Sequence, residues 1–379
     1  MPLFTLLLCA LTAYYLAAVL FLLRGLTRLA PPGEPANLSF SIVIAARNEA
    51  ENIGPCLESI FRQSLPASRY EVIVVNDRST DATAAICDRF AARYPNLRVL
   101  SVAETPAGFS PKKYAVSKGV AAASCEIIVF TDADCLVTDT WLATIDRCFT
   151  KTTGLVQGIS CYFRPEGMGS LLYGLQAVDF LSHGIVAASA IGAGMPINSS
   201  AANFAFRKKA FEEVGGYGSA AQKVVSGDDD LLLQRIAGSS WKVRFMKAAE
   251  GAVTTAPTFS VSGIFEQRKR WSSKTVNYSP RQIAFLSGIF LYYCGIAASL
   301  AVGIFRPGYL AVFFGMLLAK ITGEYLLMLP GTAIYNQKGL RKYILPASIL
   351  QLPVVLAAVV LGVFGKFSWK GERFRRKVS

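Results

Sequence analysis

Histidine is nearly absent from this 379-residue chain, in which His183 is the only one. Catalysis built on histidine, in a triad or at a zinc centre, is therefore disfavoured, and we expect a structural role for His183. The eight cysteines form no C-x-x-C pair and show no regular spacing. This pattern argues against a zinc ribbon or a disulfide framework and favours buried, reduced thiols.

Two glycine-rich signatures are also missing. No G-x-G-x-x-G follows the first apolar run, and no G-x-x-x-x-G-K-[ST] occurs. A dinucleotide-dependent dehydrogenase and a P-loop NTPase are therefore disfavoured. Charge is scarce as well, at 17% of residues against about 25% in typical soluble domains. With 53% hydrophobic residues, the chain is predicted to be ordered and partly embedded in a membrane.

The first long apolar run spans residues 3–23 and contains no charge. As a helix rising ~1.5 Å per residue it would reach about 31 Å, enough to cross the hydrocarbon core. The nearest charges, Arg24 and Arg28, follow the run. They predict a signal anchor over 1–24 whose C-terminal side faces the cytoplasm.

Three further apolar stretches, 282–305, 309–330 and 344–365, come late in the chain. Lys320 and Glu324 lie four residues apart in the second stretch and are predicted to pair on one helix face. A shallow interfacial segment is the alternative for this stretch.

The parity of the crossings leaves one question open. Three crossings after a cytoplasmic domain would leave the basic tail, 366–379, outside, against the positive-inside rule. Pro346 and Pro353 make 344–365 a candidate for a broken or re-entrant helix. The segment 168–194 has little charge and is expected either at the membrane interface or as a core helix.

The formal net charge of +14 first suggests a nucleic-acid partner. Basic and acidic residues balance between 35 and 265, and the surplus flanks the apolar stretches. Such placement is typical of segments facing anionic lipid headgroups. We therefore expect membrane lipids and no nucleic acid as partners.

The central region alternates apolar runs with helical patterns. Strands are predicted over 40–46, 70–75, 97–102 and 126–130, with helices near 49–63, 80–93 and 112–122. Short continuous Val/Ile runs separated by helices indicate a mostly parallel sheet that is covered on both faces. Such sheets bind ligands beyond the carboxyl ends of their strands.

Polar residues gather at these strand ends. Glu49 follows the first strand, Asp77 and Asp81 the second, and Asp132-x-Asp134 the fourth. Capping of the next helix is the favoured explanation for Asp81. Asp132 and Asp134 are hard oxygen donors that suit Mg²⁺ or Mn²⁺ shared with substrate phosphates.

Two more clusters follow. Asp228, Asp229 and Asp230 open a helical pattern, where the helix dipole explains part of their presence and mutual repulsion would favour a carboxylate working as a base. The run Gln267-Arg268-Lys269-Arg270-Trp271 precedes the second membrane stretch. The basic residues are expected to face either lipid phosphates or a diphosphate. The Trp271 indole is expected either in an interfacial belt or against a sugar or isoprenoid.

Taken in order, these segments resemble the membrane-bound glycosyltransferases of family 2, which have the GT-A fold. The similar segments are IVIAARNEAENI, VVNDRSTDAT, KKYAVSKG, FTDADC, SGDDDLLLQRI and the literal Q-x-x-R-W of QRKRW. The resemblance implies a cytoplasmic α/β GT-A domain over 38–275 with one N-terminal transmembrane helix and about three C-terminal ones. The expected location is the cell (inner) membrane, multi-pass.

The resemblance also implies roles by position. Glu49, Asp77, Lys112 or Lys113, Asp132 and Arg270 would bind the donor, and Asp134 with Asp132 would hold the metal. Asp229 would deprotonate the acceptor, although Asp228 replaces the family's usual Glu and is the alternative base. Gln267 and Trp271 would contact the acceptor. Ser117 stands where the family usually has Asn.

The implied reaction is an inverting, metal-dependent transfer of a hexose from a nucleotide-sugar, with a UDP-sugar expected, to a hydroxyl of a polyprenyl, carotenoid or glycerolipid acceptor. The alternative is a processive polysaccharide synthase that extends a β-linked glycan, because Q-x-x-R-W is typical of such enzymes. A transporter or scaffold is disfavoured by the intact set of carboxylates.

Overall fold

A computed structural model of the chain describes residues 2–106, 109–217, 228–273, 278–364, 366–369 and 372–375. The chain divides into two compact units. The sheet unit comprises Leu29–Pro165 and Pro196–Pro257, and the helical unit comprises Met1–Arg28, Glu166–Met195 and Thr258–Ser379. Two segments inside the expected 38–275 domain, Glu166–Met195 and the residues from Thr258 onward, therefore belong to the helical unit.

The sheet unit is built on a seven-stranded sheet with the strand order β3-β2-β1-β4-β8-β6-β9. The strands are β1 (Phe40–Ala46), β2 (Tyr70–Asp77), β3 (Leu97–Val102), β4 (Ile127–Phe130), β6 (Thr153–Gln157), β8 (Phe204–Arg207) and β9 (Lys242–Phe245). β8 is antiparallel to both of its neighbours, and the other pairs are parallel. The predicted mostly parallel α/β sheet is confirmed.

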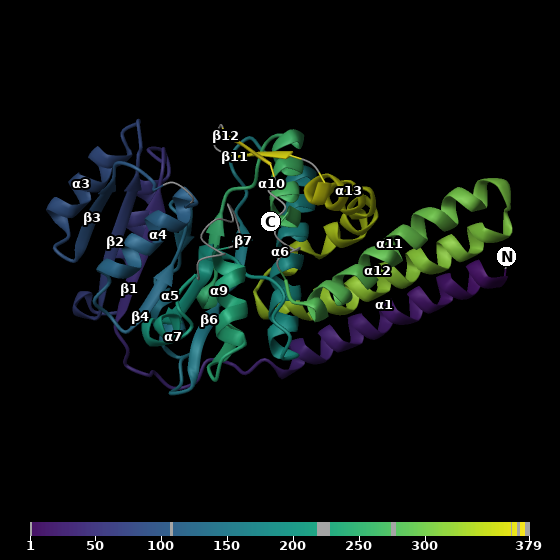
Figure 1. The fold of residues 1–379 in the computed structure, drawn as a ribbon, viewed down its shortest axis with the longest axis horizontal. Helices are drawn as coiled ribbons and strands as arrows, with labels where there is room; N and C mark the ends of the chain where they lie inside the picture. Colours follow the sequence, from purple (N-terminus) through teal and green to yellow (C-terminus); the bar gives the residue numbers. More distant parts are fainter. Residues whose placement is uncertain are drawn as a thin grey trace. The chain divides into compact units, whose positions relative to one another are not determined.

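Helices cover both faces of this sheet (Figure 1). One face packs against α2 (Ile53–Phe61), α3 (Thr83–Arg93) and α5 (Trp141–Asp146), and the other against α4 (Pro111–Ala122), α7 (Lys208–Glu213) and α9 (Asp228–Ala237). Ile42 and Ile44 belong to the first core and Val43 to the second. Alternate side chains point to opposite faces and both faces are buried, so the strands read as unbroken apolar runs.

A smaller three-stranded sheet accompanies the main one. Its order is β5-β10-β7, with β5 (Leu136–Val137), β7 (Ser160–Tyr162) and β10 (Val253–Thr255). Short 3₁₀ turns over Ala67–Arg69, Ala201–Asn203 and Ala249–Gly251 complete the sheet unit. β5 begins directly after the Asp132-x-Asp134 segment, so this segment is anchored by a strand on each side.

The helical unit contains five helices that are long and apolar enough to cross a membrane. They are α1 (Pro2–Arg28), α6 (Ser170–Gly192), α11 (Pro280–Phe305), α12 (Gly308–Ile334) and α13 (Ile344–Phe364). α1, α11 and α12 lie side by side (Figure 1). Four such segments were expected, and α6 is the fifth.

Close packing joins α1 to its neighbours. A Cβ added at Gly25 would lie 1.9 Å from the carbonyl oxygen of Ser189 on α6. The ring of Tyr15 stacks on that of Tyr292 of α11, with centroids 4.3 Å apart. Small residues that let helix backbones approach, together with such aromatic contacts, are typical of helix packing in lipid.

Polar residues meet inside the helical unit at Lys320, whose side chain is fully buried. Its Nζ donates to the Glu324 carboxylate, to the Ser348 carbonyl oxygen at 2.7 Å and to Gln351 Oε1 at 3.3 Å. The Tyr293 hydroxyl donates to Gln351 Oε1 at 3.1 Å. The predicted pairing of Lys320 with Glu324 is confirmed, and α11, α12 and α13 all contribute to the cluster.

Of the alternatives for the last apolar stretch, a broken helix is wrong, because α13 is one continuous helix. Pro346 lies in its first turn, where a backbone N–H has no intrahelical acceptor to lose. Pro353 is accommodated in the helix interior. A 3₁₀ segment, Lys338–Tyr343, precedes α13, and the strands β11 (Lys366–Trp369) and β12 (Glu372–Arg375) pair as an antiparallel hairpin after it.

Candidate active site

The loops that follow β1 and β2 are held together by side chains. Asn48 adopts a left-handed backbone, with φ of 55°, a conformation that Asn tolerates better than most residues. Its Oδ1 accepts from the Thr80 backbone N–H at 2.8 Å, and its own N–H donates to Ser79 Oγ at 3.0 Å. The two loops therefore form one rigid rim at the carboxyl edge of the sheet.

Asp81 reinforces this rim. Its carboxylate accepts from the N–H groups of Thr83 and Ala50, each at 3.0 Å. The Thr83 hydroxyl, and after it these backbone donors, lower the pKa of Asp81. Asp81 thus supports the first turn of α3, as the sequence predicts, and also fixes the neighbouring loop.

Asp77 ends β2, and its carboxylate is almost fully buried. The Arg78 guanidinium pairs with it through two contacts, Nε to Oδ1 at 2.8 Å and Nη2 to Oδ2 at 3.3 Å. Arg78 curls back because its φ is 54°. Sequence reasoning missed this pairing, because the left-handed backbone at Arg78 that turns its side chain back to Asp77 has no signal in the residue pattern.

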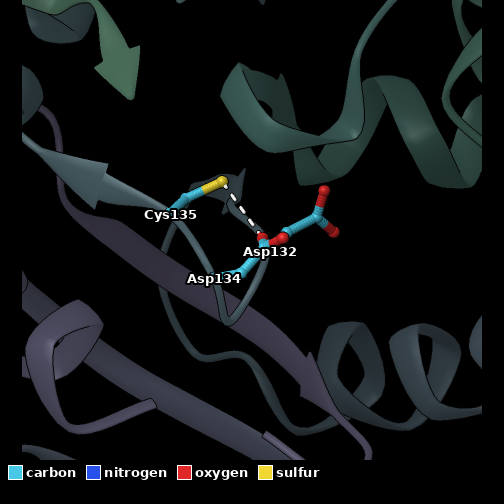
Figure 2. A group of neighbouring side chains, drawn as sticks. All are labelled: Asp132, Asp134 and Cys135. Atoms are coloured by element: carbon cyan, nitrogen blue, oxygen red, sulfur yellow. Dashed lines mark hydrogen bonds between the residues drawn. The ribbon is translucent and has the colours of Figure 1, made fainter. Parts of the chain in front are cut away.

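Asp132 and Asp134 lie in the loop after β4, beside Cys135 (Figure 2). One ligand atom from each of these three residues lies within 4.8 Å of the others. Asp132 Oδ1 accepts from Lys112 Nζ at 2.7 Å, and the Cys135 thiol lies 3.5 Å from Asp134 Oδ1. Among the described residues this is the only group of three acidic, thiol or imidazole side chains close enough to share a cation.

Burial and neighbouring charges shift the pKa values of Asp134 and Cys135. Removal from water, and then the nearby charges of Asp132 and Glu49, raise the pKa of Asp134. Burial and the two aspartates raise the pKa of Cys135 well above its usual value. Hard divalent cations prefer carboxylate oxygens to sulfur, and two carboxylates that repel one another fit such a cation.

The two neighbouring lysines differ in placement. Lys112 reaches the carboxylate edge and pairs with Asp132. Lys113 is buried, with 1% of its surface exposed. Both lysines stay candidates for the donor site, and the structure shows a contact with Asp132 for Lys112.

The first turn of α9 is connected to the sheet edge of Asp132 and Asp134 through Ser199 and β8. Asp230 Oδ1 accepts from the backbone N–H of Ser199 at 2.5 Å. Ser199 lies shortly before β8, and Phe204 at the start of β8 pairs with Phe130 at the end of antiparallel β4. The start of β8 and the end of β4 therefore share one sheet edge.

Asp229 precedes Asp230 in this turn and is 7% exposed. The register thus brings α9, which begins with the acidic run, to the edge that Asp132 and Asp134 occupy. Asp228 opens α9, but its side chain lies outside what the structure describes.

The Q-x-x-R-W segment lies on α10 (Val261–Ser273), in the helical unit. Gln267, Arg270 and Trp271 all belong to this helix, and Trp271 contacts α6 through Phe180 and His183. His183 Nδ1 lies 2.7 Å from the Asp179 carbonyl oxygen. The structural role expected for His183 is therefore to support Trp271.

Comparison with known sequences identifies the family. Residues 7–377 match glycosyl transferase family 21. The chain belongs to this family. The predicted assignment as a glycosyltransferase is confirmed. The sequence resemblance pointed to family 2, whereas the family model that matches is that of family 21. The protein is a glycosyltransferase with a GT-A-like fold.

Individual relatives are similar over shorter ranges. The glycosyltransferase AglE of Haloferax volcanii is 36% identical over 102 residues, 27% of this chain and 32% of AglE. The beta-monoglucosyldiacylglycerol synthase of Synechocystis sp. is 27% identical over 285 residues, 69% of this chain and 54% of the relative. The 4,4'-diaponeurosporenoate glycosyltransferase of Staphylococcus aureus is 38% identical over 96 residues, 25% of this chain and 24% of the relative. The chain therefore spans between a quarter and about half of these relatives.

A solved structure that resembles nearly the whole chain comes from an enzyme named a mannosyltransferase. The mannosyltransferase PcManGT from Pyrobaculum calidifontis, in complex with GDP-Man and Mn²⁺, aligns over 95% of this chain and 98% of its own. Its TM-score is 0.56 and its sequence identity 20%. At this identity the likeness establishes the fold.

Proposed function

We propose that this glycosyltransferase moves a sugar from a nucleotide-sugar to the hydroxyl of a membrane lipid. The observation that supports this most directly is the pair Asp132 and Asp134, which follows a parallel strand at the edge where α/β sheets bind ligands. The pair occurs in a chain with five helices able to cross a membrane.

A divalent cation fits the site. Asp132 and Asp134 supply hard oxygen donors, which Mg²⁺ and Mn²⁺ prefer to the sulfur of the neighbouring Cys135. Mg²⁺ or Mn²⁺ held there would neutralise the charge that develops on a nucleoside diphosphate as it leaves. Lys112 would add a second positive charge on the same side, and Asp77 with Glu49 would face the nucleoside.

The chemical step that we propose is a single displacement. The acceptor oxygen forms a bond to the anomeric carbon while the bond from that carbon to the diphosphate oxygen breaks. The hydroxyl proton passes to Asp229, with Asp228 as the alternative base. Attack from the face opposite the leaving group inverts the configuration, and a positioned base contributes about 10²–10⁴-fold.

The lipid class of the acceptor draws support from the relatives. One of them is named a beta-monoglucosyldiacylglycerol synthase, and a diacylglycerol is a membrane lipid. The positive charges at the C-terminal end of α1, Arg24 and Arg28, favour a cytoplasmic sheet unit. Gln267, Arg270 and Trp271 keep the roles proposed from the sequence, with Arg270 at the diphosphate and the other two at the acceptor.

Product analysis tests this function. Purified protein in liposomes receives radiolabelled UDP-sugars or GDP-sugars together with Mg²⁺ or Mn²⁺. Label that partitions into organic solvent as a glycolipid would support the proposal. Label in a large polymer that organic solvent leaves behind would support the processive synthase instead, and release of free sugar alone would contradict both.

A further inference from the structure

α6 contains one charged residue in 23, Asp179. A carboxylate in so apolar a helix is costly unless it is paired, and such residues usually mark function. Asp179 forms an ion pair with Nη2 of Arg268 on α10. Both side chains are largely buried, with 22% of Asp179 and 8% of Arg268 exposed.

The same guanidinium also lies over an indole. Cζ of Arg268 is 4.3 Å from the centroid of the Trp271 ring. Arg268 Nε is buried and has no hydrogen-bond acceptor among the described residues. This fits a guanidinium that lies over the face of an aromatic ring. Arg is well suited to this double contact because its planar group can pair with a carboxylate and stack at once.

α6 also supports Trp271 through two aromatic side chains. His183 meets the indole edge-to-face, with centroids 5.3 Å apart and planes at 66°. Phe180 lies 6.0 Å away in a tilted arrangement. Since a carbonyl can only accept, the 2.7 Å contact from His183 Nδ1 to the Asp179 carbonyl oxygen places a proton on Nδ1. The imidazole orientation is therefore fixed by the same residue that holds Arg268.

We propose that Asp179 and Arg268 are positioning residues that hold the Trp271 indole in one orientation for the lipid acceptor. Asp179 anchors Arg268 from α6, and Arg268 fixes one face of the ring. This inference rests on the proposed role of Trp271 in acceptor binding. It assigns a function to Arg268, which is one of the two unspecified positions of Q-x-x-R-W.

Steady-state kinetics with separate variation of donor and acceptor test the proposal. Asp179→Asn and Arg268→Met are expected to raise the acceptor KM by about 5- to 30-fold, the range that a lost cation–π contact spans, and to leave the donor KM within twofold. Arg268→Lys keeps the positive charge but lacks the planar guanidinium. Its acceptor KM should lie between that of the parent and those of the two other variants. Glu266→Gln is the matched control, because it removes an α10 ion pair with Lys269 and should leave both KM values unchanged.

A charge-swapped double variant separates positioning from simple helix pairing. Asp179→Arg with Arg268→Asp restores an ion pair between α6 and α10 but removes the cation from α10. We expect the thermal stability in detergent to recover while the acceptor KM stays raised. Full recovery of the acceptor KM would overturn the proposal.

Trp271 fluorescence gives a readout that does not depend on turnover. The indole contribution, taken as the difference from Trp271→Phe, should change in Arg268→Met and not in Glu266→Gln. An unchanged contribution in Arg268→Met would show that Arg268 does not fix the ring. If the parent transfers sugar and the variants keep the parent acceptor KM, this inference fails alone; if the parent transfers no sugar to lipid, the proposed function fails.

Discussion

Lys112 Nζ lies 2.7 Å from Asp132 Oδ1, so the carboxylate expected to hold a cation already has a cationic partner. Replacing this lysine by Met leaves Asp132 and Asp134 without that partner and removes a charge from the diphosphate side. We expect Lys112→Met to raise the donor KM by about 10- to 100-fold, in line with one charge-assisted contact. Radiolabel transfer at varied donor concentration measures it, and an unchanged donor KM would contradict the assignment.

Asp134 is expected to govern metal dependence. In Asp134→Asn one hard anionic donor is lost, so Mn²⁺-dependent donor binding should fall by at least about 10-fold. Calorimetric titration of the donor with and without Mn²⁺ measures the difference. Asp139→Asn is the matched control, because this exposed carboxylate lies in the turn after β5 and pairs only with exposed Arg62 among the described side chains.

Asp229 and Asp228 compete for the role of base. If Asp229 accepts the proton, Asp229→Asn should lower kcat by about 10²–10⁴-fold while donor affinity changes little. Asp228→Asn should then keep most of the turnover. A large loss of kcat in Asp228→Asn with little loss in Asp229→Asn would identify Asp228 as the base. Loss of donor binding in Asp229→Asn would indicate that Asp229 contacts the donor.

Glu71 couples stability to pH. Burial alone would raise the pKa of Glu71, but hydrogen bonds from Ser41 and Ser124 and the charge of Arg98 outweigh it, and the net pKa is lowered. The stabilisation is therefore complete above the unfolded pKa of about 4.3 and is lost as pH falls through the folded pKa.

We therefore expect Glu71→Gln to unfold at a lower temperature than the parent at pH 7, with the difference shrinking below about pH 4. Scanning calorimetry across this range tests the prediction. Glu58→Gln, a change at an exposed position of α2, should show no such pH dependence. A constant Tm difference for Glu71→Gln at all pH values would be inconsistent with the linkage.

The buried pair in α12 should respond asymmetrically. Glu324→Gln leaves the Lys320 ammonium buried without its anion, so the helical unit should lose about 3–5 kcal/mol of stability. The double change Lys320→Met with Glu324→Gln should lose less, because no charge stays buried. Thermal unfolding in detergent compares the two, and equal losses would argue against a buried ion pair.

Particular residues show how far sequence reasoning reaches. The strands predicted over 40–46 and 97–102 coincide with β1 and β3, because both segments are rich in apolar residues that favour strands. The helix expected near 49–63 begins at Ile53, because the residues before it form a loop whose N–H groups at Glu49 and Ala50 bond to Thr83 and Asp81. Such contacts between distant segments have no local sequence signal.

The candidate site shows the same division. Asp132-x-Asp134 could be placed at a strand end because it directly follows an apolar run. The approach of α9 to that edge depends on the antiparallel insertion of β8 between β4 and β6, and a linear pattern does not encode strand order. The left-handed turn at Arg78, which neutralises Asp77, is equally invisible to spacing.

The polar cluster around Lys320 has a consequence for biosynthesis. Glu324, on the same helix, can meet the ammonium as soon as α12 forms, but Ser348 and Gln351 emerge from the ribosome only later. In a nascent chain that ends before α13, the Lys320 ammonium would have Glu324 as its partner and would lack the acceptors that Ser348 and Gln351 provide. Arrival of α13 supplies the Ser348 carbonyl and the Gln351 amide oxygen, so we expect the ammonium to be fully hydrogen-bonded only after α13 has left the ribosome and packed against α12.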